Sequence, residues 1–480
     1  MKKASHRASD LVQFSALELS AAIHARDVSC REVMTAYLDQ IGRINPKVNA
    51  IVSLQPEAQL MAQALRCDEQ LASGETVGWM HGFPQAIKDL SATVGIPSTM
   101  GSPLFRDFLP TSDGIAVARM KQAGAIIIGK TNVPEFGAGS QTYNPVFGST
   151  KCAYDETRTA GGSSGGAAVA LATRMQAVAD GSDMMGSLRN PAAFNNVFGF
   201  RPSFGVVPIG SPELYLQQLA TDGPMGRNVP DMLALLRTQA GYHTGVPLSR
   251  DLPAFGDDLR LNGGDIRIGW LGNYRDYLAI DPEILRLCET ALKQLEALGC
   301  RVDATHPDFS MAELWHSWLT LRQWSVASAR YADYEEPERR AKMKSEIVWE
   351  IKRGLQLSAL DIYQASAIRS RWYRAVMALF DTYDFLVLPS AQVFPFDADQ
   401  HWPRVIGDRA MDTYHRWMEV VIGPTMAGLP AVNVPVGFGP HGLPMGMQII
   451  GRPHADIEVL KIAHAYDAVT GWVEKRPPAC

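Results

Sequence analysis

Two serines that lie 24 residues apart are the residues of this chain best suited to covalent chemistry. Ser163 stands in the loop Gly161–Gly166, and Ser187 stands in the segment Ser182–Arg189. Lys88 precedes both and lies among apolar neighbours. Burial lowers the pKa of a lysine from about 10.4 toward a value near 7–8, where the neutral amine can take a proton from a serine. The three residues suggest acyl transfer by a serine whose base is not histidine, and hence cleavage of amide-like bonds.

The glycine-rich loop has other interpretations. It can be a flexible turn at a helix start, or its N–H groups can hold an anion, although no lysine follows the glycines as it does in a phosphate loop. Gly161–Gly165 also fits G-x-S-x-G, the nucleophile elbow, which needs a strand directly before it. The preceding segment, 153–159, is polar and does not look like a buried strand. Eleven scattered histidines offer no evident partner, so the elbow is the weaker explanation.

Ser187 has the more favourable local context. Residues 177–180 are expected to form a strand, 181–186 a tight turn, and Ser187 to open a short helix before Pro191. In such a turn the backbone N–H groups of four residues can converge on a developing oxyanion, and these are Met184, Met185, Gly186 and Ser187. A serine here could equally be a plain helix cap, and Lys88 could extend out of its strand into water. Their occurrence together favours catalysis.

Composition narrows the class of protein. The 480 residues are 46% hydrophobic and 20% charged, which is ordinary for a globular protein, and the net charge of −5 argues against a nucleic-acid partner. The six cysteines are scattered without a CxxC pair, which fits reduced, mostly structural thiols better than a zinc site or a disulfide framework. Neither a metal nor any other cofactor is expected. No signal-like segment and no apolar run of about 18 residues occur. We therefore expect a cytoplasmic protein without a membrane partner.

The elements that must position these residues suggest an α/β protein. Residues 1–75 are predicted to form an N-terminal helical layer, since Ser15 and Ser29 each begin a capping-box pattern. Residues 76–242 alternate short apolar runs with helices and would hold the catalytic core. Residues 243–264 are rich in Pro, Gly and Asp and are predicted to form a surface connection.

The C-terminal part, 265–480, is expected to complete the sheet and the substrate pocket. Strands are predicted near 266–270, 300–304, 385–388, 420, 431–434 and 445–450, with a helix from Asp281 and mostly helices over 311–380. No internal repeat is evident. The prediction is a single domain over 1–480, a large mixed β-sheet sandwiched between helices in an α/β/α arrangement.

Taken together, the motifs resemble the amidase signature family. The segments that carry the resemblance are 82–89, 129–137, 158–166, 183–192 and 428–435. By position, the resemblance implies that Ser187 is the nucleophile and that Ser163 is a bridging serine, preceded by a cis Gly162–Ser163 peptide. Lys88 then becomes the base. Four further residues would support the loops, namely Ser164, Asp183, Arg158 and Arg189.

One position departs from the family pattern. The family usually has two glycines before the nucleophile, whereas this chain has Met185 and Gly186. A methionine in the left-handed region would cost roughly 1–2 kcal/mol. We therefore expect Met185 to have a negative φ and to line or narrow the pocket.

Three functions are compatible with the resemblance. The first is a stand-alone hydrolase of small apolar or aromatic amides, acting on a small-molecule substrate, with esters, anilides or carbamates (urethanes) as further substrates and a homodimer as a possible state. The second is the glutamine-hydrolysing subunit of a tRNA-dependent amidotransferase. Those subunits bind the ammonium of glutamine with an acidic residue, whose matching position here is near Met418, beside Glu419. The third is an inactive binding protein on the same fold.

Overall fold

The computed structural model describes residues 8–253, 256, 258–261 and 264–479. The helices are α1 (Ala8–Leu11), α2 (Ala16–His24), α3 (Cys30–Val48), α4 (Glu57–Ser73), α5 (Ile115–Gln122), α6 (Gly165–Ala172), α7 (Arg189–Phe194), α8 (Val229–Gln239), α9 (Pro282–Ala297), α10 (Met311–Glu335), α11 (Pro337–Arg340), α12 (Ser345–Gly354), α13 (Ala359–Phe380), α14 (Ile422–Ala427), α15 (Asp456–Thr470) and α16 (Trp472–Lys475). Short 3₁₀ turns are η1 (Pro103–Phe105), η2 (Glu135–Gly137) and η3 (Arg416–Val421).

The strands are β1 (Ile51–Val52), β2 (Pro84–Lys88), β3 (Ile126–Thr131), β4 (Tyr143–Asn144), β5 (Gly148–Ser149), β6 (Lys151–Cys152), β7 (Asp155–Thr159), β8 (Ala179–Asp183), β9 (Phe198–Arg201), β10 (Thr221–Gly226), β11 (Arg267–Trp270), β12 (Arg301–Ala304), β13 (Phe385–Pro389), β14 (Val405–Ile406), β15 (Arg409–Ala410), β16 (Ala431–Phe438) and β17 (Pro444–Ile450). Eight of them form one sheet in the order β12-β11-β13-β17-β16-β9-β10-β8. The first three run parallel and the other pairs are antiparallel, so the sheet is mixed as expected.

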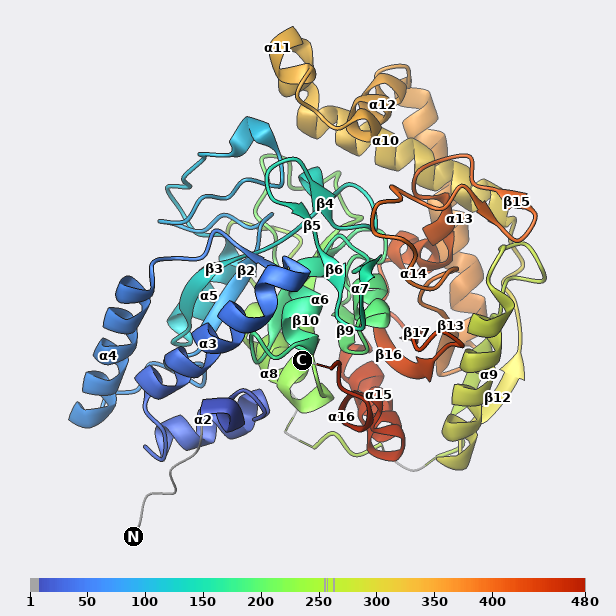
Figure 1. Cartoon of the computed structure of the whole chain (residues 1–480). Coiled ribbons are helices and arrows are strands. Elements are labelled where there is room, and N and C mark those ends of the chain that lie inside the picture. The colour runs from blue at the N-terminus through green and yellow to red at the C-terminus, as the bar shows by residue number, and fades with distance from the viewer. Residues whose placement is uncertain (1–7, 254–255, 257, 262–263, 480) are drawn as a thin grey trace.

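Helices cover both faces of this sheet. Figure 1 shows α7 and α14 on one side of the strands and α8, α9 and α15 on the other. β16 and β17 are buried along nearly their whole length, which explains their continuous apolar runs. The same picture places α2 to α4 at one flank and α10, α12 and α13 at the opposite, upper flank. The expected α/β fold with a large helix-covered sheet is confirmed.

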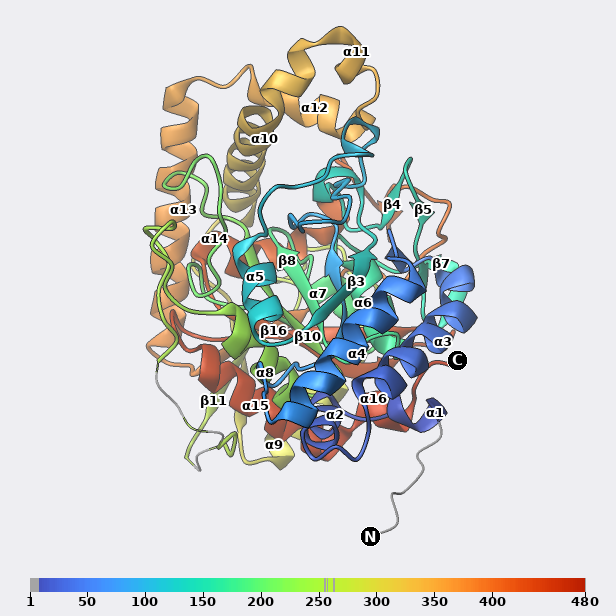
Figure 2. The same cartoon turned by 90° about the vertical axis from the view of Figure 1, so that its left-hand side faces the viewer.

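The N-terminal layer follows the expected capping chemistry. Ser15 and Ser29 each accept a hydrogen bond from the backbone N–H three residues later, and the glutamate at that position bonds back. The carboxylate of Asp231 on α8 then accepts hydrogen bonds from the N–H groups of Ala16, at 2.8 Å, and Leu17, at 3.1 Å. The start of α2 is thereby tied to the core of the molecule. Figure 2 views the molecule from the side on which α3 and α4 lie in front.

Two expectations about the elements are wrong, and both concern short apolar segments. The strands β3 and β2, the second of which ends at Lys88, lie outside the large sheet and form a separate sheet in the order β1-β3-β2. Residues 51–52, expected to be helical, supply its edge strand β1. The apolar segment near 420 is helical (η3 and α14), because a short buried run fits a helix and a strand equally well.

The segment before the glycine-rich loop is not a buried strand, as expected. Residues 155–159 form the partly exposed strand β7, which pairs with β6 in a small hairpin. α6 follows the loop and packs closely against the small sheet. A Cβ added at Gly166 would lie 2.3 Å from the backbone nitrogen of Asn132, so only glycine allows this approach. The close packing brings the loop that holds Ser163 next to the end of β2.

Among the described residues, no helix is long and apolar enough to cross a membrane. No group of three or more His, Cys, Asp or Glu side chains in the described ranges is arranged to hold a metal ion. Five cysteines, from Cys30 to Cys300, have free thiols, and Cys480 lies outside the described residues.

Candidate active site

Lys88 is the last residue of β2, and its side chain is almost completely buried, with 1% exposure. Its Nζ donates hydrogen bonds to Ser163 Oγ at 2.9 Å, to Ser164 Oγ at 2.7 Å and to Ser182 Oγ at 2.8 Å. The backbone N–H of Lys88 donates to the carboxylate of Asp180 on β8, at 3.2 Å to either oxygen. The small sheet, the glycine-rich loop and the edge of the large sheet therefore meet at one amine.

Burial lowers the pKa of Lys88 from 10.5 to about 8, against the opposing effect of nearby carboxyl groups. Asp222, Asp180 and Asp183 all act to raise it. Two of these carboxyl groups are themselves perturbed, because burial raises the pKa of Asp222 to about 7 and that of Asp180 to about 6. A substantial neutral fraction of Lys88 near pH 8 gives the site a proton acceptor.

A second buried lysine shows that a lowered pKa alone does not mark the base. Burial also lowers the pKa of Lys130, on β3, to about 8. Its Nζ, however, donates to the carbonyl of Ser91 and to the hydroxyl of Thr93. Of these two lysines it is Lys88 that contacts the serines of the glycine-rich loop, so geometry separates them.

The Gly162–Ser163 peptide bond is cis, as the resemblance implied. Ser163 is buried, with 2% exposure, and Ser164 makes no side-chain cap to α6, since its hydroxyl faces Lys88. The backbone N–H of Ser164 donates to the carbonyl of Ser187 at 3.3 Å. This contact joins the two serine loops directly.

Asp183 and two arginines hold the loop that carries Ser187. Asp183 accepts hydrogen bonds from Arg189 at 2.9 Å through both oxygens, and Arg201 approaches at 3.3 Å. All three side chains are fully buried. Burial alone would raise the pKa of Asp183, but the guanidinium groups of Arg189 and Arg201 hold this pKa well below its usual range. Asp183 therefore stays ionised as a fixed anchor of the loop.

The backbone N–H of Gly186 does not take the expected orientation. It donates to the Oδ1 atom of Asp183 at 2.9 Å, so it is already paired with a carboxylate that would oppose an oxyanion. In the described part of the chain, the N–H groups of Met184, Met185 and Ser187 make no hydrogen bond to a protein acceptor. Three of the four expected donors therefore remain available.

Met185 has a negative φ: the described non-glycine residues with a positive φ do not include it. Its side chain is buried, with 6% exposure, and lines the cavity at Ser187. The positive φ of this loop belongs to Gly186, at +77°, where a Cβ would also lie 2.8 Å from Val421 Cγ2. The expectation for Met185 is confirmed, and Gly186 is the position that requires glycine.

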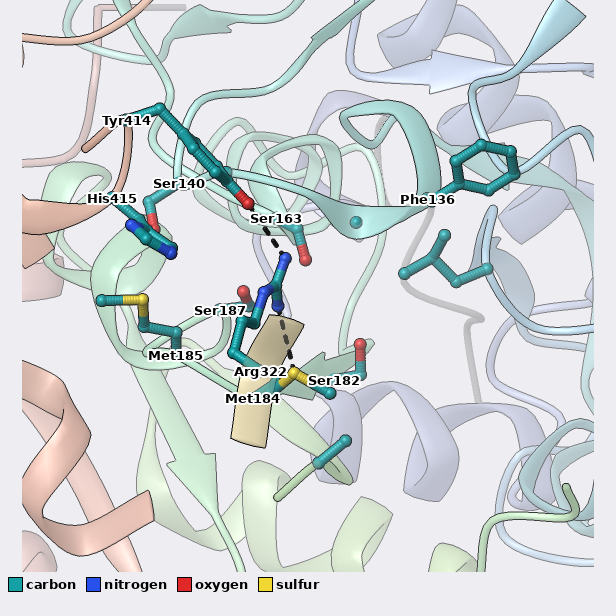
Figure 3. Close-up of a pocket in the computed structure, with 14 residues that line it drawn as sticks. Phe136, Ser140, Ser163, Ser182, Met184, Met185, Ser187, Arg322, Tyr414 and His415 are labelled. Carbon is teal, nitrogen blue, oxygen red and sulfur yellow. Dashed lines mark hydrogen bonds between the residues drawn. The ribbon is translucent and has the colours of Figure 1, made fainter. Parts of the chain in front are cut away.

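Ser163 and Ser187 open into one cavity of about 140 Å³ (Figure 3). Its lining combines the serine loops with segments far along the chain, and consists of Leu90, Phe136, Gly137, Gly139, Ser140, Ser163, Ser182, Met184, Met185, Ser187, Ala220, Arg322, Tyr414 and His415. Figure 3 shows the guanidinium of Arg322 facing the same space as the hydroxyls of Ser163 and Ser187. The cavity is therefore polar at the serines and apolar around Met185, Phe136 and Leu90.

Arg322 belongs to a buried network on one wall of the cavity. Its Nε donates to Glu350 Oε1 at 3.1 Å, and its two terminal nitrogens donate to Tyr414 Oη and to Met184 Sδ, each at 3.1 Å. Tyr414 also donates to Glu350, at 2.9 Å. Burial lowers the pKa of the neighbouring His415, which is stacked on Tyr414. Glu350 thus compensates the charge of Arg322 at the cavity wall.

Several residues at the site belong to no sequence motif that could have identified them. Arg322, Tyr414 and His415 reach the cavity from distant segments, and Ser182, Asp180 and Asp222 surround Lys88. The sequence did give a sign of Arg322, since it is the one arginine in the Leu- and Trp-rich stretch 314–329. Nothing in the local sequence indicates that Asp222 faces a lysine on another sheet.

Arg158 is the one expected supporting residue that lies away from the catalytic loops. Arg158, on β7, was expected to hold the catalytic loops, but its side chain is 40% exposed and pairs with Asp155 at 3.7 Å. It does not line the cavity. Ser164, Asp183 and Arg189 do lie where a supporting role would place them.

Neither of the two positions considered for an ammonium-binding acidic residue, 418 and 419, lines the cavity. Met418 is fully buried in the core. Glu419 is also buried; its carboxylate pairs with Arg416 at 2.8 Å and accepts a hydrogen bond from Tyr277 at 2.9 Å. The described lining of the cavity contains no acidic side chain.

Comparisons with known proteins agree on one family. The family model named Amidase matches residues 32–460. The chain is 32% identical to a glutamyl-tRNA(Gln) amidotransferase subunit of Thermosynechococcus vestitus, over 96% of this chain and 98% of the relative. It is 31% identical to an acylamidase of Rhodococcus erythropolis, over 96% and 97%. A bacterial aryl acylamidase of the amidase signature family superposes with a TM-score of 0.90 at 27% identity, covering 97% of this chain and 99% of that structure.

Proposed function

The chain belongs to the amidase signature family, and we propose that it is a stand-alone hydrolase of small apolar or aromatic amides. The observation that carries the proposal is the 2.9 Å hydrogen bond from Lys88 Nζ to Ser163 Oγ, at the cavity that Ser187 lines. The similarity to an acylamidase and an aryl acylamidase supports the substrate class. Anilides, esters and carbamates, including urethanes, are further candidates because they undergo the same acyl transfer.

In the proposed mechanism Ser187 Oγ attacks the amide carbonyl carbon. Its proton passes to the Ser163 hydroxyl, whose own proton passes to neutral Lys88. The N–H groups of Met184, Met185 and Ser187 stabilise the oxyanion, each worth about 10²–10³ in rate. The proton then returns through Ser163 to the leaving nitrogen as the C–N bond breaks. Water hydrolyses the acyl-enzyme by the same relay and releases the acid.

Two lysine variants test this relay against a matched control. Lys88→Met removes the base, and we expect kcat/KM for a small aryl amide to fall by about 10⁴-fold or more, as Ser187→Ala should also cause. Lys130→Met removes an equally buried lysine whose Nζ bonds to Ser91 and Thr93 and not to the serines of the glycine-rich loop. This variant should lose stability but keep most of its activity per folded molecule. Equal losses in Lys88→Met and Lys130→Met would overturn the assignment of the base.

The amidotransferase subunit is the second candidate, because the chain is 32% identical to such a protein over nearly its whole length. The absence of an acidic side chain from the described cavity lining speaks against a glutamine substrate. The purified chain should therefore hydrolyse aryl amides alone and leave glutamine intact. Glutamine hydrolysis that depends on partner subunits would favour the second candidate. No turnover of any amide, ester or carbamate would indicate an inactive binding protein.

A further inference from the structure

A second cavity adjoins the one that holds Ser163 and Ser187. It has a volume of about 550 Å³, against about 140 Å³ for the first. The residues that line it are Met184, Phe204, Gly205, Val207, Pro208, Ile209, Ser211, Pro212, Glu213, Leu214, Leu216, Gln217, Ala220, Val246, Leu248, Trp324, Ser325, Ser328, Ala329 and Arg330. Met184 and Ala220 line both cavities, so they form the junction between them.

The lining of this second cavity, the chamber, offers a ligand mainly apolar surface. It comes from the segment 204–220 on one side and from Trp324 and its neighbours on α10 on the other. Its two charged side chains are already paired. The carboxylate of Glu213 accepts hydrogen bonds from the backbone N–H groups of residues 215–217. Arg330 pairs with Asp333 at 3.3 Å and lies over the ring of Phe136.

The junction can open without breaking a strong contact. The Met184 sulfur accepts a hydrogen bond from a terminal nitrogen of Arg322 at 3.1 Å, and a thioether is a weak acceptor. Methionine is flexible and fills irregular gaps. A substrate atom can therefore displace the Met184 side chain while Arg322 keeps its bonds to Glu350 and Tyr414.

We propose that the chamber binds the apolar part of the amide substrate, with the reacting carbonyl at Ser187 and the chain passing between Met184 and Ala220. This inference rests on the proposed function. The volume of the first cavity accommodates the amide group and few further atoms, whereas the chamber has the size of a ligand pocket. The substrate class is then an amide with an alkyl chain or aromatic ring that is too long for the first cavity.

Two series of substrates test this inference. One varies the acyl group of p-nitroanilides from acetyl to octanoyl, and the other varies a 4-alkyl group on acetanilide. In at least one series we expect kcat/KM to rise about three- to fourfold per methylene beyond the junction, the increment for burying a CH₂ group. Ala220→Phe should remove this rise, measured within the variant as kcat/KM for each substrate relative to that for the shortest one. Ala332→Phe, on the exposed side of α10 outside both cavities, is the matched control and should keep the rise.

The outcomes separate this inference from the proposed function. Two outcomes would contradict substrate binding in the chamber while leaving the proposed hydrolase function in place. One is cleavage of the short anilides with no length dependence in either series, and the other is a rise in kcat/KM that survives Ala220→Phe. If no anilide is cleaved, the proposed function fails, and binding becomes the test. Octanamide should then bind Ser187→Ala at least tenfold more tightly than acetamide does by calorimetry, and this advantage should disappear with Ala220→Phe added. Equal affinity for the two amides overturns the chamber.

Discussion

Lys88 can accept a proton only as a neutral amine, so its surroundings set the pH at which the proposed relay operates. Burial removes the water that would stabilise the ammonium form, and this effect exceeds the attraction of three carboxyl groups. The folded pKa of about 8 lies below the ordinary value of 10.5, so the unfolded chain binds more protons between these values. Burial of this lysine therefore opposes folding at low pH, and this penalty is relieved as the pH rises through that window.

The activity should rise with pH in the range where Lys88 loses its proton. With a pKa of about 8, kcat/KM for a small aryl amide should increase about tenfold per pH unit below pH 7 and level off above about pH 9. The pH profile of kcat/KM, measured where the protein remains folded, checks this. A profile that is flat from pH 6 to 9 would contradict a lysine base.

Asp222 offers a way to shift that profile. It is the strongest of the carboxyl groups that raise the pKa of Lys88. Asp222→Asn should therefore move the midpoint of the kcat/KM profile to lower pH, since the ammonium form loses its strongest compensation. Asp303→Asn, on β12 at the opposite edge of the large sheet, is the matched control and should leave the midpoint in place. A shift of the midpoint to higher pH in Asp222→Asn would contradict the prediction that Asp222 raises the pKa of Lys88.

At the scale of elements, the end of β8 does most to place the proposed nucleophile. β8 is the edge strand of the large sheet, and its last residue, Asp183, fixes the following turn through the N–H groups of Gly186 and Leu188. Arg189, at the start of α7, completes the anchor. A buried carboxylate shared with two arginines is costly to break, so the turn should move little during catalysis.

Gly186→Ala should disrupt this turn. The alanine must adopt a φ near +77° and approach Val421 too closely, and the left-handed conformation alone costs about 1–2 kcal/mol. We expect a fall in kcat/KM of about a hundredfold or more, with a lower free energy of unfolding in urea. Gly42→Ala in α3, where a Cβ meets nothing within 4 Å, should instead raise stability by about 0.5–1 kcal/mol and keep activity. Wild-type activity in Gly186→Ala would show that the turn tolerates rearrangement.

At the scale of the whole molecule, the site depends on contacts between two cores. The largest apolar cluster collects residues from Met185 to Val473, whereas a second cluster runs from Leu11 to Val178 and includes Leu235 of α8. Lys88 comes from the region of the second cluster, and Ser187 from that of the first. The site therefore exists only when both cores are formed and packed together.

This dependence predicts one cooperative unfolding transition. Separate unfolding of the N-terminal layer would expose α8 and the buried face of α6, and would break the contacts of Asp231 with α2. Far-UV circular dichroism, tryptophan fluorescence and residual amidase activity should thus change together in urea. Activity that disappears in an early, separate transition would show that the two cores unfold independently.

The sequence alone determined the features that depend on local chemistry. Capping boxes at Ser15 and Ser29, the helix from Asp281 and the buried strand at 431–434 follow from residues close together in the chain, and the structure contains all of them. The motifs around Ser163, Ser187 and Lys88 sufficed to recognise the family, because the residue types and spacings are unusual together.

Only the tertiary structure decided which of these residues meet. Two lysines lie in similar apolar strands, and the position of their Nζ atoms relative to Ser163 depends on how two sheets pack. The orientation of the Gly186 N–H and the approach of Arg322 to the cavity likewise depend on contacts between distant segments. Local propensity carries no information about such distances, since folding brings these groups together only through the packing of the whole chain.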